Sequence, residues 1–292
     1  MPDHSTEFER HRPRLFGIAY RMLGSRSDAE DVLQDAYLRW HRGASEEPRS
    51  PEAWLVTTVT RLCIDRLRAA RTQREQYVGP WLPEPLIGDA APAADAGAEL
   101  SSSLSIAFLV VLEQLEPDER AAFLLHEVFD TDYTEIAEIL GKSEAACRQV
   151  VSRARKRVRG RRPRAQVTDA ARRSVLERFA NAVQMQDKAA LLELVAEQAS
   201  WTSDGGGRAR AALKAIRGRE RVVRFALGVL GRHADKFAFE MTCVNGEPAL
   251  AVRAEGSLFS VITVRTDGMR ILDVYTVLNP DKLAAPGTPT LG

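Results

Sequence analysis

A strongly basic segment in the middle of the chain sets the tightest limit on its fold. Residues 148–164, RQVVSRARKRVRGRRPR, hold nine lysines and arginines and no acid, although the net charge of the 292-residue chain is only +1. At 100° per residue, a helix over residues 144–159 gathers its apolar side chains on one face: Cys147, Val150, Val151, Ala154 and Val158. Such a helix must pack that face on other helices and leave its basic face in solvent.

The residues before this segment predict further helices. We expect them over 104–115, from Pro117, from Asp132-Tyr133-Thr134 and, after a turn at Gly141-Lys142-Ser143, from Glu144. A short helix, a glycine-containing turn and a second helix form a helix-turn-helix signature. The polar face of the last helix then offers guanidinium, amide and hydroxyl groups to base edges and phosphates. A solvated basic helix is the alternative, and the helix-turn-helix spacing favours DNA contact.

The first 78 residues predict three helices. Helical spacing runs through Leu15, Ile18 and Met22 and again over residues 28–40, with Ser27 or Asp28 as the cap after a break at 24–27. Residues 46–51 predict a loop. Ser50 and Pro51 suit the cap and first turn of a third helix, which we expect to run to about Arg74.

Two of these helices carry charged stripes. On helix 28–40, Asp28, Asp31, Gln34 and Asp35 lie opposite Leu33, Ala36, Tyr37 and Trp40, which suits either plain solvation or docking of a basic protein. The third helix is basic in its second half and could lie along phosphates through Arg61, Arg66, Arg68, Arg71 and Arg74. A local pair between Asp65 and Arg68 is the structural alternative there.

Residues 79–103 predict a linker, with four prolines, four acids and no basic residue. Trp81 stands in its Pro-rich strip, WLPEP, and is expected to dock on a neighbouring surface. From 165 the chain changes character, with helices near 169–186, 188–197 and 216–231. Alternating runs at 236–244, 248–254, 257–266 and 270–277 predict strands, joined by hairpin turns at Asn245-Gly246 and Thr266-Asp267-Gly268. Helices followed by a meander indicate an α+β domain.

Three blocks of this sequence resemble a bacterial sigma factor of the extracytoplasmic-function type. They are DAEDVLQDAYLRW (28–40), PEAWLVTTVTRLCIDRLR (51–68) and YTEIAEILGKSEAACRQVVSRARKRV (133–158). WLPEP (81–85), DGGGR (204–208) and NPDKL (279–283) are similar to the marks of a subgroup with a fused C-terminal SnoaL-like domain. The sequence departs from that subgroup at Arg208, where lysine often follows the glycines. The charge is kept, and the donor geometry changes.

The resemblance implies a multidomain protein: two all-α sigma domains followed by an α+β SnoaL-like cone domain. Its parts would be sigma region 2 at 1–78, the linker at 79–103, the helix-turn-helix of region 4 at 104–164 and the regulatory domain at 165–292. The implied partners are core RNA polymerase, through its β′ clamp helices and β flap, and promoter DNA. The family also implies an intramolecular contact between the SnoaL-like domain and the sigma part.

The resemblance further assigns roles to named residues. Contact with the β′ clamp helices falls on Asp28, Asp31, Gln34 and Asp35. Recognition of the −10 element falls on Trp54, Arg61, Arg68 and Arg71, with loop 41–51 capturing an unstacked base, a step that costs a few kcal/mol. At the −35 element we expect Arg148, Gln149, Ser152 and Arg153 at bases or nearby phosphates and Arg155, Lys156 and Arg159 at the backbone. The cis-regulatory contact would use Trp81, Pro83, Asp204, Gly205, Gly206, Gly207, Asn279, Pro280, Asp281, Lys282 and Leu283.

A SnoaL-like cone can also be an enzyme pocket, which needs acid–base residues inside it. Asp273 and Tyr275 share one strand face and could line such a pocket, although a satisfied polar pair is favoured. His233 stands at the end of a helical stretch. The glycines at 205–207 suit a tight turn better than a phosphate cradle.

Composition narrows the remaining classes. Cys63, Cys147 and Cys243 lie far apart, which argues against a disulfide framework or a zinc site, and no cofactor or metal is expected. No apolar run approaches the length of a membrane span, and the N-terminus lacks the apolar core of a secretory signal. These features predict a reduced, cytoplasmic protein without a membrane contact.

The sequence therefore predicts a sigma factor that is not an enzyme and that its C-terminal domain regulates in cis. The main alternative is a DNA-binding regulator whose SnoaL-like pocket binds a small effector or performs enzyme chemistry. An ordinary helix-turn-helix repressor is a further alternative, against which the acidic helix 28–40 argues, because a repressor needs no polymerase-docking domain. The direction of the C-terminal domain's effect is not predicted.

Overall fold

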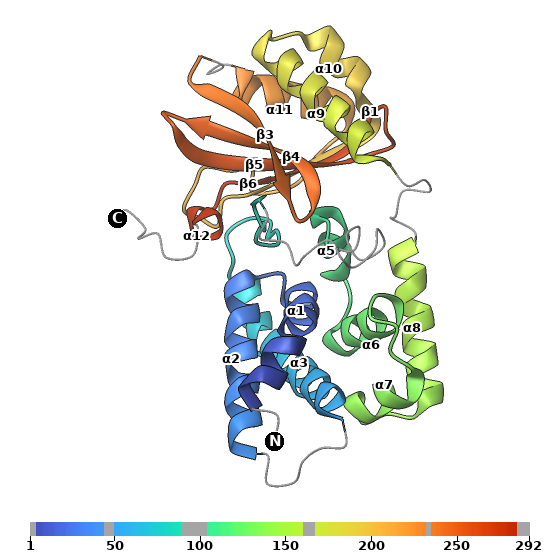
Figure 1. Cartoon of the computed structure of the whole chain (residues 1–292). Helices are drawn as coiled ribbons and strands as arrows, with labels where there is room; N and C mark the ends of the chain where they lie inside the picture. The colour runs from blue at the N-terminus through green and yellow to red at the C-terminus, as the bar shows by residue number, and fades with distance from the viewer. Residues whose placement is uncertain (1–3, 44–49, 89–103, 160–166, 232–234, 285–292) are drawn as a thin grey trace. The chain divides into compact units, whose positions relative to one another are not determined.

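A computed structural model describes residues 4–43, 50–88, 104–159, 167–231 and 235–284 of the chain (Figure 1). They form two compact units. The first takes in the described residues of Met1–Glu75, Pro92–Leu104 and Phe108–Arg162, and the second those of Gln76–Ala91, Ser105–Ala107 and Pro163–Gly292. The helical regions thus share one unit, whereas the first part of the linker, including WLPEP, belongs with the C-terminal domain. Among the described residues, no helix is both long and apolar enough to cross a membrane.

Three long helices open the first unit: α1 (His4–Leu23), α2 (Arg26–Gly43) and α3 (Pro51–Glu75). Their apolar stripes meet in a core that includes Leu15, Leu33 and Leu55, all of them fully buried. The expected start of α3 is confirmed, because the Ser50 hydroxyl accepts the Ala53 amide at 3.3 Å. The expected cap of α2 is wrong: Ser25, rather than Ser27 or Asp28, accepts the Asp28 amide, at 3.2 Å.

Four shorter helices complete this unit: α5 (Ile106–Leu112), α6 (Pro117–Glu127), α7 (Tyr133–Leu140) and α8 (Glu144–Arg159). The α7 start follows the sequence prediction, since the Asp132 carboxylate accepts the Glu135 amide at 2.8 Å. Gly141 ends α7 in the left-handed conformation, at φ 63°, which lets the chain turn sharply into α8. The helix-turn-helix is therefore present where the sequence placed it.

A buried arginine joins the two halves of the helical unit. Arg120 of α6 is 2% exposed, and its Nη1 donates to the Met22 carbonyl of α1 and to the Glu113 carboxylate, at 2.6 Å each. Burying a guanidinium costs free energy because the group loses its hydration, and the hydrogen bonds to these two acceptors offset that cost. The contact ties α6 to α1.

The second unit is a mixed sheet covered on one face by helices α9 (Asp169–Gln184), α10 (Lys188–Leu194) and α11 (Arg219–Val229) (Figure 1). Its strands run in the order β2-β1-β6-β5-β4-β3. The four expected strands are β3 (Phe237–Val244), β4 (Glu247–Ala254), β5 (Ser257–Thr266) and β6 (Ile271–Val277), in an antiparallel meander. The short helix α12 (Pro280–Leu283) follows.

Two further strands were not predicted from the sequence. The helix expected over 188–197 ends at Leu194, and β1 (Val195–Asp204) begins directly after it. β1 pairs parallel with β6 and antiparallel with the short edge strand β2 (Ile216–Arg217). Its local sequence, VAEQASWTSD, alternates weakly, and the partner strand β6 lies far along the chain. Long-range pairing therefore overrode a weak local pattern here.

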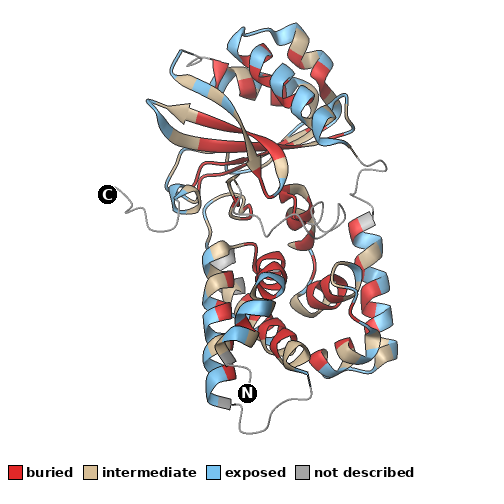
Figure 2. Ribbon diagram, viewed as in Figure 1, coloured by how far each residue is buried: buried red, intermediate tan, exposed pale blue. Residues whose placement is uncertain are grey.

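The helix-covered face of the sheet is filled by side chains. Trp201 of β1 lies with its ring centroid 6.0 Å from Phe179 of α9 and 5.4 Å from Phe225 of α11. Leu250, Ile262 and Val274 from three neighbouring strands complete the same core. The red ribbon segments in Figure 2 show this buried layer between sheet and helices.

Candidate promoter interface and linker-docking site

Helix α8 presents the basic face that its sequence predicted. Cys147, Val150, Val151, Ala154 and Val158 are all buried, whereas the opposite side shows a series of exposed side chains: Arg148, Gln149, Ser152, Arg153 and Lys156. Figure 2 shows this division along the helix. Ser143 accepts the Ala146 amide at 3.3 Å and so caps the helix just before its exposed face begins. Forked and amide donors thus stand on a rigid, capped helix, which is the arrangement that major-groove readers use.

Two of the expected −35 residues already have partners within the helical unit. Arg148 pairs with Glu144 at 2.7 Å, and its guanidinium carbon lies 5.1 Å from the centre of the Tyr133 ring. Arg155 is half-buried and pairs with Glu127 of α6, a hydrogen bond that raises the pKa of Arg155. Arg155 therefore points toward α6 more than the helical wheel suggested. The side chain of Arg159 lies outside the described residues.

The acidic face of α2 is held by one arginine of α3. Arg66 donates to Asp28 at 2.9 Å through Nε and to Asp31 at 2.7 Å through Nη2. Gln34 and Asp35, further along the same stripe, are exposed. The stripe is therefore partly neutralised at its first turn and open beyond it, a distinction that helix spacing alone did not reveal.

The expected −10 residues sit on α3, close to the helix-turn-helix. Trp54 packs against Trp40 of α2, with ring centroids 5.3 Å apart. Arg61 donates to the carbonyls of Ile139 and Glu138 at the end of α7, at 3.0 and 2.9 Å. Arg68 pairs with Asp118 of α6 at 2.7 Å. Asp65, the partner that local spacing predicted, is 3.9 Å from Arg68. Arg71's side chain and the loop residues 44–49 lie outside the described residues.

A buried carboxylate in the second unit gathers the linker and the tail. Asp204, at the end of β1, is completely buried. Its Oδ1 accepts the Tyr77 hydroxyl at 2.6 Å, and its Oδ2 accepts the Leu82 amide at 2.8 Å and the Lys282 ammonium at 2.7 Å. Leu82 belongs to the linker, Tyr77 lies two residues before its predicted start, and Lys282 belongs to α12. Both the burial of its hydroxyl and the hydrogen bond to Asp204 raise the pKa of Tyr77.

Lys282 closes this site from the tail. Its Nζ also donates to the Leu82 carbonyl at 2.5 Å and lies 4.2 Å from the centre of the Trp81 ring and 5.1 Å from that of Tyr77. An ammonium loses its hydration when it is buried, and here a carboxylate, a carbonyl and two aromatic faces offset that cost. We call Tyr77, Trp81, Leu82, Asp204 and Lys282 the linker clamp.

The glycine turn after Asp204 is needed for close approach. A Cβ added at Gly206, where φ is +57°, would lie 2.2 Å from Asn279 Nδ2 and 2.8 Å from the Tyr77 hydroxyl. Asn279 in turn donates to that hydroxyl at 3.0 Å and caps α12 by accepting the Asp281 amide. The glycines therefore form the tight turn that the sequence favoured, and Arg208 lies 3.5 Å from Asp281 at its rim.

A second linker contact was missed by sequence reasoning. Asn245 is fully buried, and it accepts the Leu86 amide on its side chain at 2.8 Å and donates its own amide to the Leu86 carbonyl at 2.9 Å. Ile87 adds a bridge to Val244. Asn245-Gly246 was interpreted only as a hairpin turn, which it also forms. The buried asparagine side chain has no signal in sequence spacing, because its partner is 159 residues away. Tyr77 and Leu82 were missed for the same reason.

Asp273 and Tyr275 do not converge on a pocket. Asp273 accepts Arg265 Nε at 2.6 Å and the Ser200 hydroxyl at 2.5 Å, so its partners are on neighbouring strands. Asp273 is therefore satisfied, as favoured, but not by Tyr275. His233 lies outside the described residues. In the described part of the chain, no cluster of three or more histidine, cysteine, aspartate or glutamate side chains could hold a metal ion.

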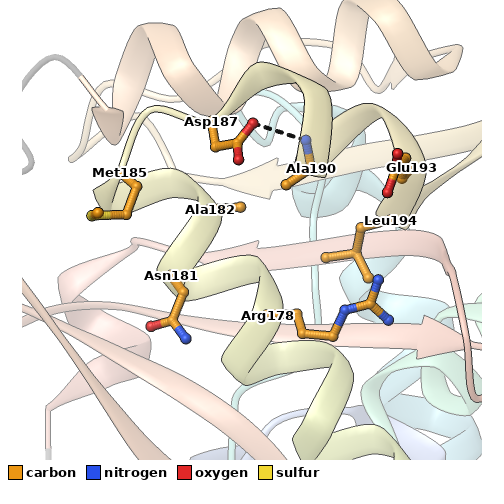
Figure 3. A pocket seen from close by; sticks show the side chains of 8 residues that line it. All are labelled: Arg178, Asn181, Ala182, Met185, Asp187, Ala190, Glu193 and Leu194. Carbon is orange, nitrogen blue, oxygen red and sulfur yellow. Dashed lines mark hydrogen bonds between the residues drawn. The ribbon is translucent and has the colours of Figure 1, made fainter.

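A small open pocket of about 260 Å³ lies between α9 and α10 (Figure 3). Met185, Asn181 and Arg178 line one side and Glu193 and Leu194 the other, while Asp187 is turned back to cap α10 at Ala190. Charged side chains and apolar side chains both line the pocket, and no acid and base among them point at one another. The pocket does not supply the effector or catalytic site that the alternative function requires.

The arrangement of an acidic helix, a basic helix-turn-helix and a tethered α+β domain defines a promoter-recognition factor of the sigma-70 class. The sigma-70 region 2 family matches residues 8–73, and the sigma-70 region 4 family matches residues 105–158. The chain is 39% identical to the ECF RNA polymerase sigma factor SigJ of Mycobacterium tuberculosis, over 97% of this chain and 94% of that protein. The chain belongs to the extracytoplasmic-function (ECF) RNA polymerase sigma factors.

Further comparisons support this family and the fold class expected from the sequence. The probable ECF sigma factor SigI of the same species is 30% identical over 96% of this chain and 94% of its own length. The crystal structure of Mycobacterium tuberculosis SigJ matches with a TM-score of 0.76 at 37% identity, covering 96% of this chain and 98% of SigJ. Because that match spans nearly the whole chain, it includes the C-terminal α+β domain as well as the helical regions.

Proposed function

We propose that this sigma factor docks on core RNA polymerase, reads both promoter elements, and is regulated through its own linker by the C-terminal domain. The proposed division follows the sequence: region 2 over 1–78, the linker over 79–103, region 4 over 104–164 and the regulatory domain over 165–292. The single observation that carries the regulatory part is the buried Asp204 carboxylate, which accepts hydrogen bonds from Tyr77 just before the linker, from Leu82 in the linker and from Lys282.

Region 4 would read the −35 element through the exposed face of α8. Arg148 and Gln149 lie in the N-terminal half of the helix, where a recognition helix meets base edges. Ser152, Arg153 and Lys156 continue the same exposed face and suit nearby phosphates. Arg155 fits a backbone contact less well, because Glu127 already pairs with it.

Region 2 would dock on the β′ clamp helices through α2. Gln34 and Asp35 are exposed, whereas Asp28 and Asp31 share Arg66, so the open negative charge of the stripe lies at Asp35. Asp35 is therefore the strongest candidate for an ion pair with the polymerase, and Asp31→Asn is expected to weaken docking less than Asp35→Asn.

Recognition of the −10 element would use Trp54, Arg61, Arg68 and Arg71 on α3. Arg61 and Arg68 have to exchange their contacts with α7 and α6 for DNA phosphates. That exchange requires regions 2 and 4 to separate before they bind the promoter. The C-terminal domain could regulate transcription by controlling this separation of regions 2 and 4.

The linker clamp is the proposed regulatory contact, because it ties residues 77–82, at the start of the linker and directly before it, to β1 and α12. A domain fused to its target acts at an effective concentration on the order of millimolar, so even modest clamp affinity keeps the linker docked. Pro83, which follows Leu82 of the clamp, is buried. Asn279 donates a hydrogen bond to the Tyr77 hydroxyl of the clamp. We expect release of the linker to change transcription output and to leave promoter choice unchanged.

In vitro transcription with core RNA polymerase tests this proposal. Trp81→Ala should change output from the cognate promoter, because it removes the aromatic face under the Lys282 ammonium. The matched control is Trp201→Phe, which lies in the domain core away from the linker. Truncations after about 165 and about 278 then give the direction of the effect: more output means that the domain is a brake, and less means that it holds an active spacing. Unchanged output from Trp81→Ala would reject the regulatory contact.

We further propose that the protein works in the cytoplasm, where core polymerase and promoter DNA meet, and that it is not an enzyme. The second statement rests on its relatives being sigma factors and on the structural role found for Asp273.

A further inference from the structure

The C-terminal domain carries a dense basic segment for which neither the clamp nor the core has a use. Residues 208–224, RARAALKAIRGRERVVR, contain seven arginines and lysines and one acid. The rest of residues 165–292 contains ten basic and thirteen acidic residues, so the domain's positive charge is concentrated in this one stretch. It comprises the loop after the glycine turn, edge strand β2 and the first half of α11.

Five of these side chains are exposed, and the segment contains a single acid. They form what we call the basic strip: Arg210, Lys214, Arg217, Arg221 and Arg224. The two others are used elsewhere, Arg208 beside Asp281 and Arg219 beside Glu197. Within the part of the chain that the structure describes, no ion pair is found for any residue of the strip.

Two acids beside the strip are already paired with other cations. Glu197 on β1 pairs with Arg219 at 3.2 Å, and Glu220 at the start of α11 lies 4.0 Å from Lys188. The strip therefore keeps its positive charge uncompensated. A concentration of like charges is unfavourable in the isolated domain, and this favours an anionic partner.

The geometry of α11 and β2 turns three arginines of the strip toward solvent. Val222, Val223 and Ala226 are buried against the sheet, which turns Arg221 and Arg224 outward on one side of the helix. Arg217 precedes them on β2, where its strand neighbour Ile216 points inward and Arg217 outward. Gly218, at φ 91°, makes the turn between strand and helix without placing a side chain between the charges.

We propose that the basic strip binds the phosphate backbone of promoter DNA, as a contact independent of both helical regions. Duplex DNA presents one negative charge per about 1.7 Å of its axis, a density that suits a row of arginines and lysines. The strip carries no asparagine or glutamine and no aromatic side chain, the residues that would read bases or stack on them. Binding is therefore expected to be independent of sequence. An acidic protein surface is the competing partner. DNA is favoured because a sigma factor that binds a promoter brings its C-terminal domain near DNA.

Salt dependence of promoter binding by the holoenzyme tests the proposal. Arg217, Arg221 and Arg224 are replaced together by glutamine in the full chain, which is loaded on core polymerase. Losing three phosphate contacts should reduce the slope of log K against log salt by about 3 and weaken binding about tenfold or more at low salt. The loss should be equal on promoters that differ in sequence around the −35 and −10 elements.

The matched control replaces three exposed basic residues of the same domain that lie outside the strip: Arg173, Arg178 and Lys236. Both variants lose the same charge, so an effect of net charge alone would appear in both. An unchanged salt slope in the strip variant, or equal changes in the two variants, overturns the proposal. Weaker assembly with core polymerase in the absence of DNA also overturns it, in favour of an acidic protein partner.

Discussion

Replacing Lys282 by methionine should release the linker from the C-terminal domain. Methionine keeps most of the aliphatic stem and removes the ammonium, so the packing on Trp81 remains while three electrostatic contacts are lost: those with Asp204, the Leu82 carbonyl and the Trp81 ring. Lys282 is 12% exposed and Asp204 is completely buried, so solvent screens this pair little. Removing one partner of a buried pair costs about 3–5 kcal/mol, and the residual hydrogen bonds from Tyr77 and Leu82 favour the lower value. At 1.4 kcal/mol per factor of ten, the linker should undock about a hundredfold more often.

Chymotrypsin cleavage measures this undocking directly, because the clamped segment 77–82 contains Tyr77 and Trp81 as cleavage sites and neither is followed by proline. Cleavage at both bonds, located by mass spectrometry, should accelerate in Lys282→Met under conditions where opening precedes cutting. Lys236→Met is the matched control, since Lys236 is an exposed lysine of the same domain. Equal cleavage rates in Lys282→Met, the control and the unsubstituted protein would refute the reasoning that this ion pair holds the linker.

Three further predictions concern other parts of the chain. Arg148→Ala should weaken −35 binding by about 1–3 kcal/mol and relax base preference, whereas Lys156→Ala should weaken all promoters alike and lower the salt slope by about 1; promoter titrations at several salt concentrations distinguish these results. Burial raises the pKa of Glu247 to about 7 despite its pair with Arg172, so the folded domain binds a proton that the unfolded chain lacks between about pH 4.5 and 7. Stability should then fall as pH rises through that window, by up to about 1.4 kcal/mol per pH unit, and Glu247→Gln should flatten the dependence in urea titrations. Arg120→Ala should destabilise the helical unit by about 3 kcal/mol, measured by thermal unfolding, because the Met22 carbonyl and the Glu113 carboxylate lose the donor that they share; a change under about 1 kcal/mol would show that the α1–α6 joint does not depend on it.

The helices of this protein could be predicted from sequence because their signals are local. Ser50 and Asp132 cap α3 and α7, Gly141 ends α7, and the apolar stripe of α8 points inward, all as spacing predicted. Burial follows from a period of 3.6 residues, which a single segment displays by itself. The same periodicity predicts which face of α8 is exposed and basic.

The clamp and the sheet were decided by tertiary structure. The motifs around Trp81, Asp204 and Lys282 pointed to an intramolecular contact through resemblance. Only the fold shows that Asp204 is the shared acceptor and that Tyr77 and Leu82 donate to it. β1 was misread in part as helix because its partner β6 is far away in the chain. The sequence alone determined the helices of the first unit and their charged faces, since those properties depend on residues within a few turns of one another. Contacts between residues far apart in the chain depend on chain closure and burial, which no local period encodes.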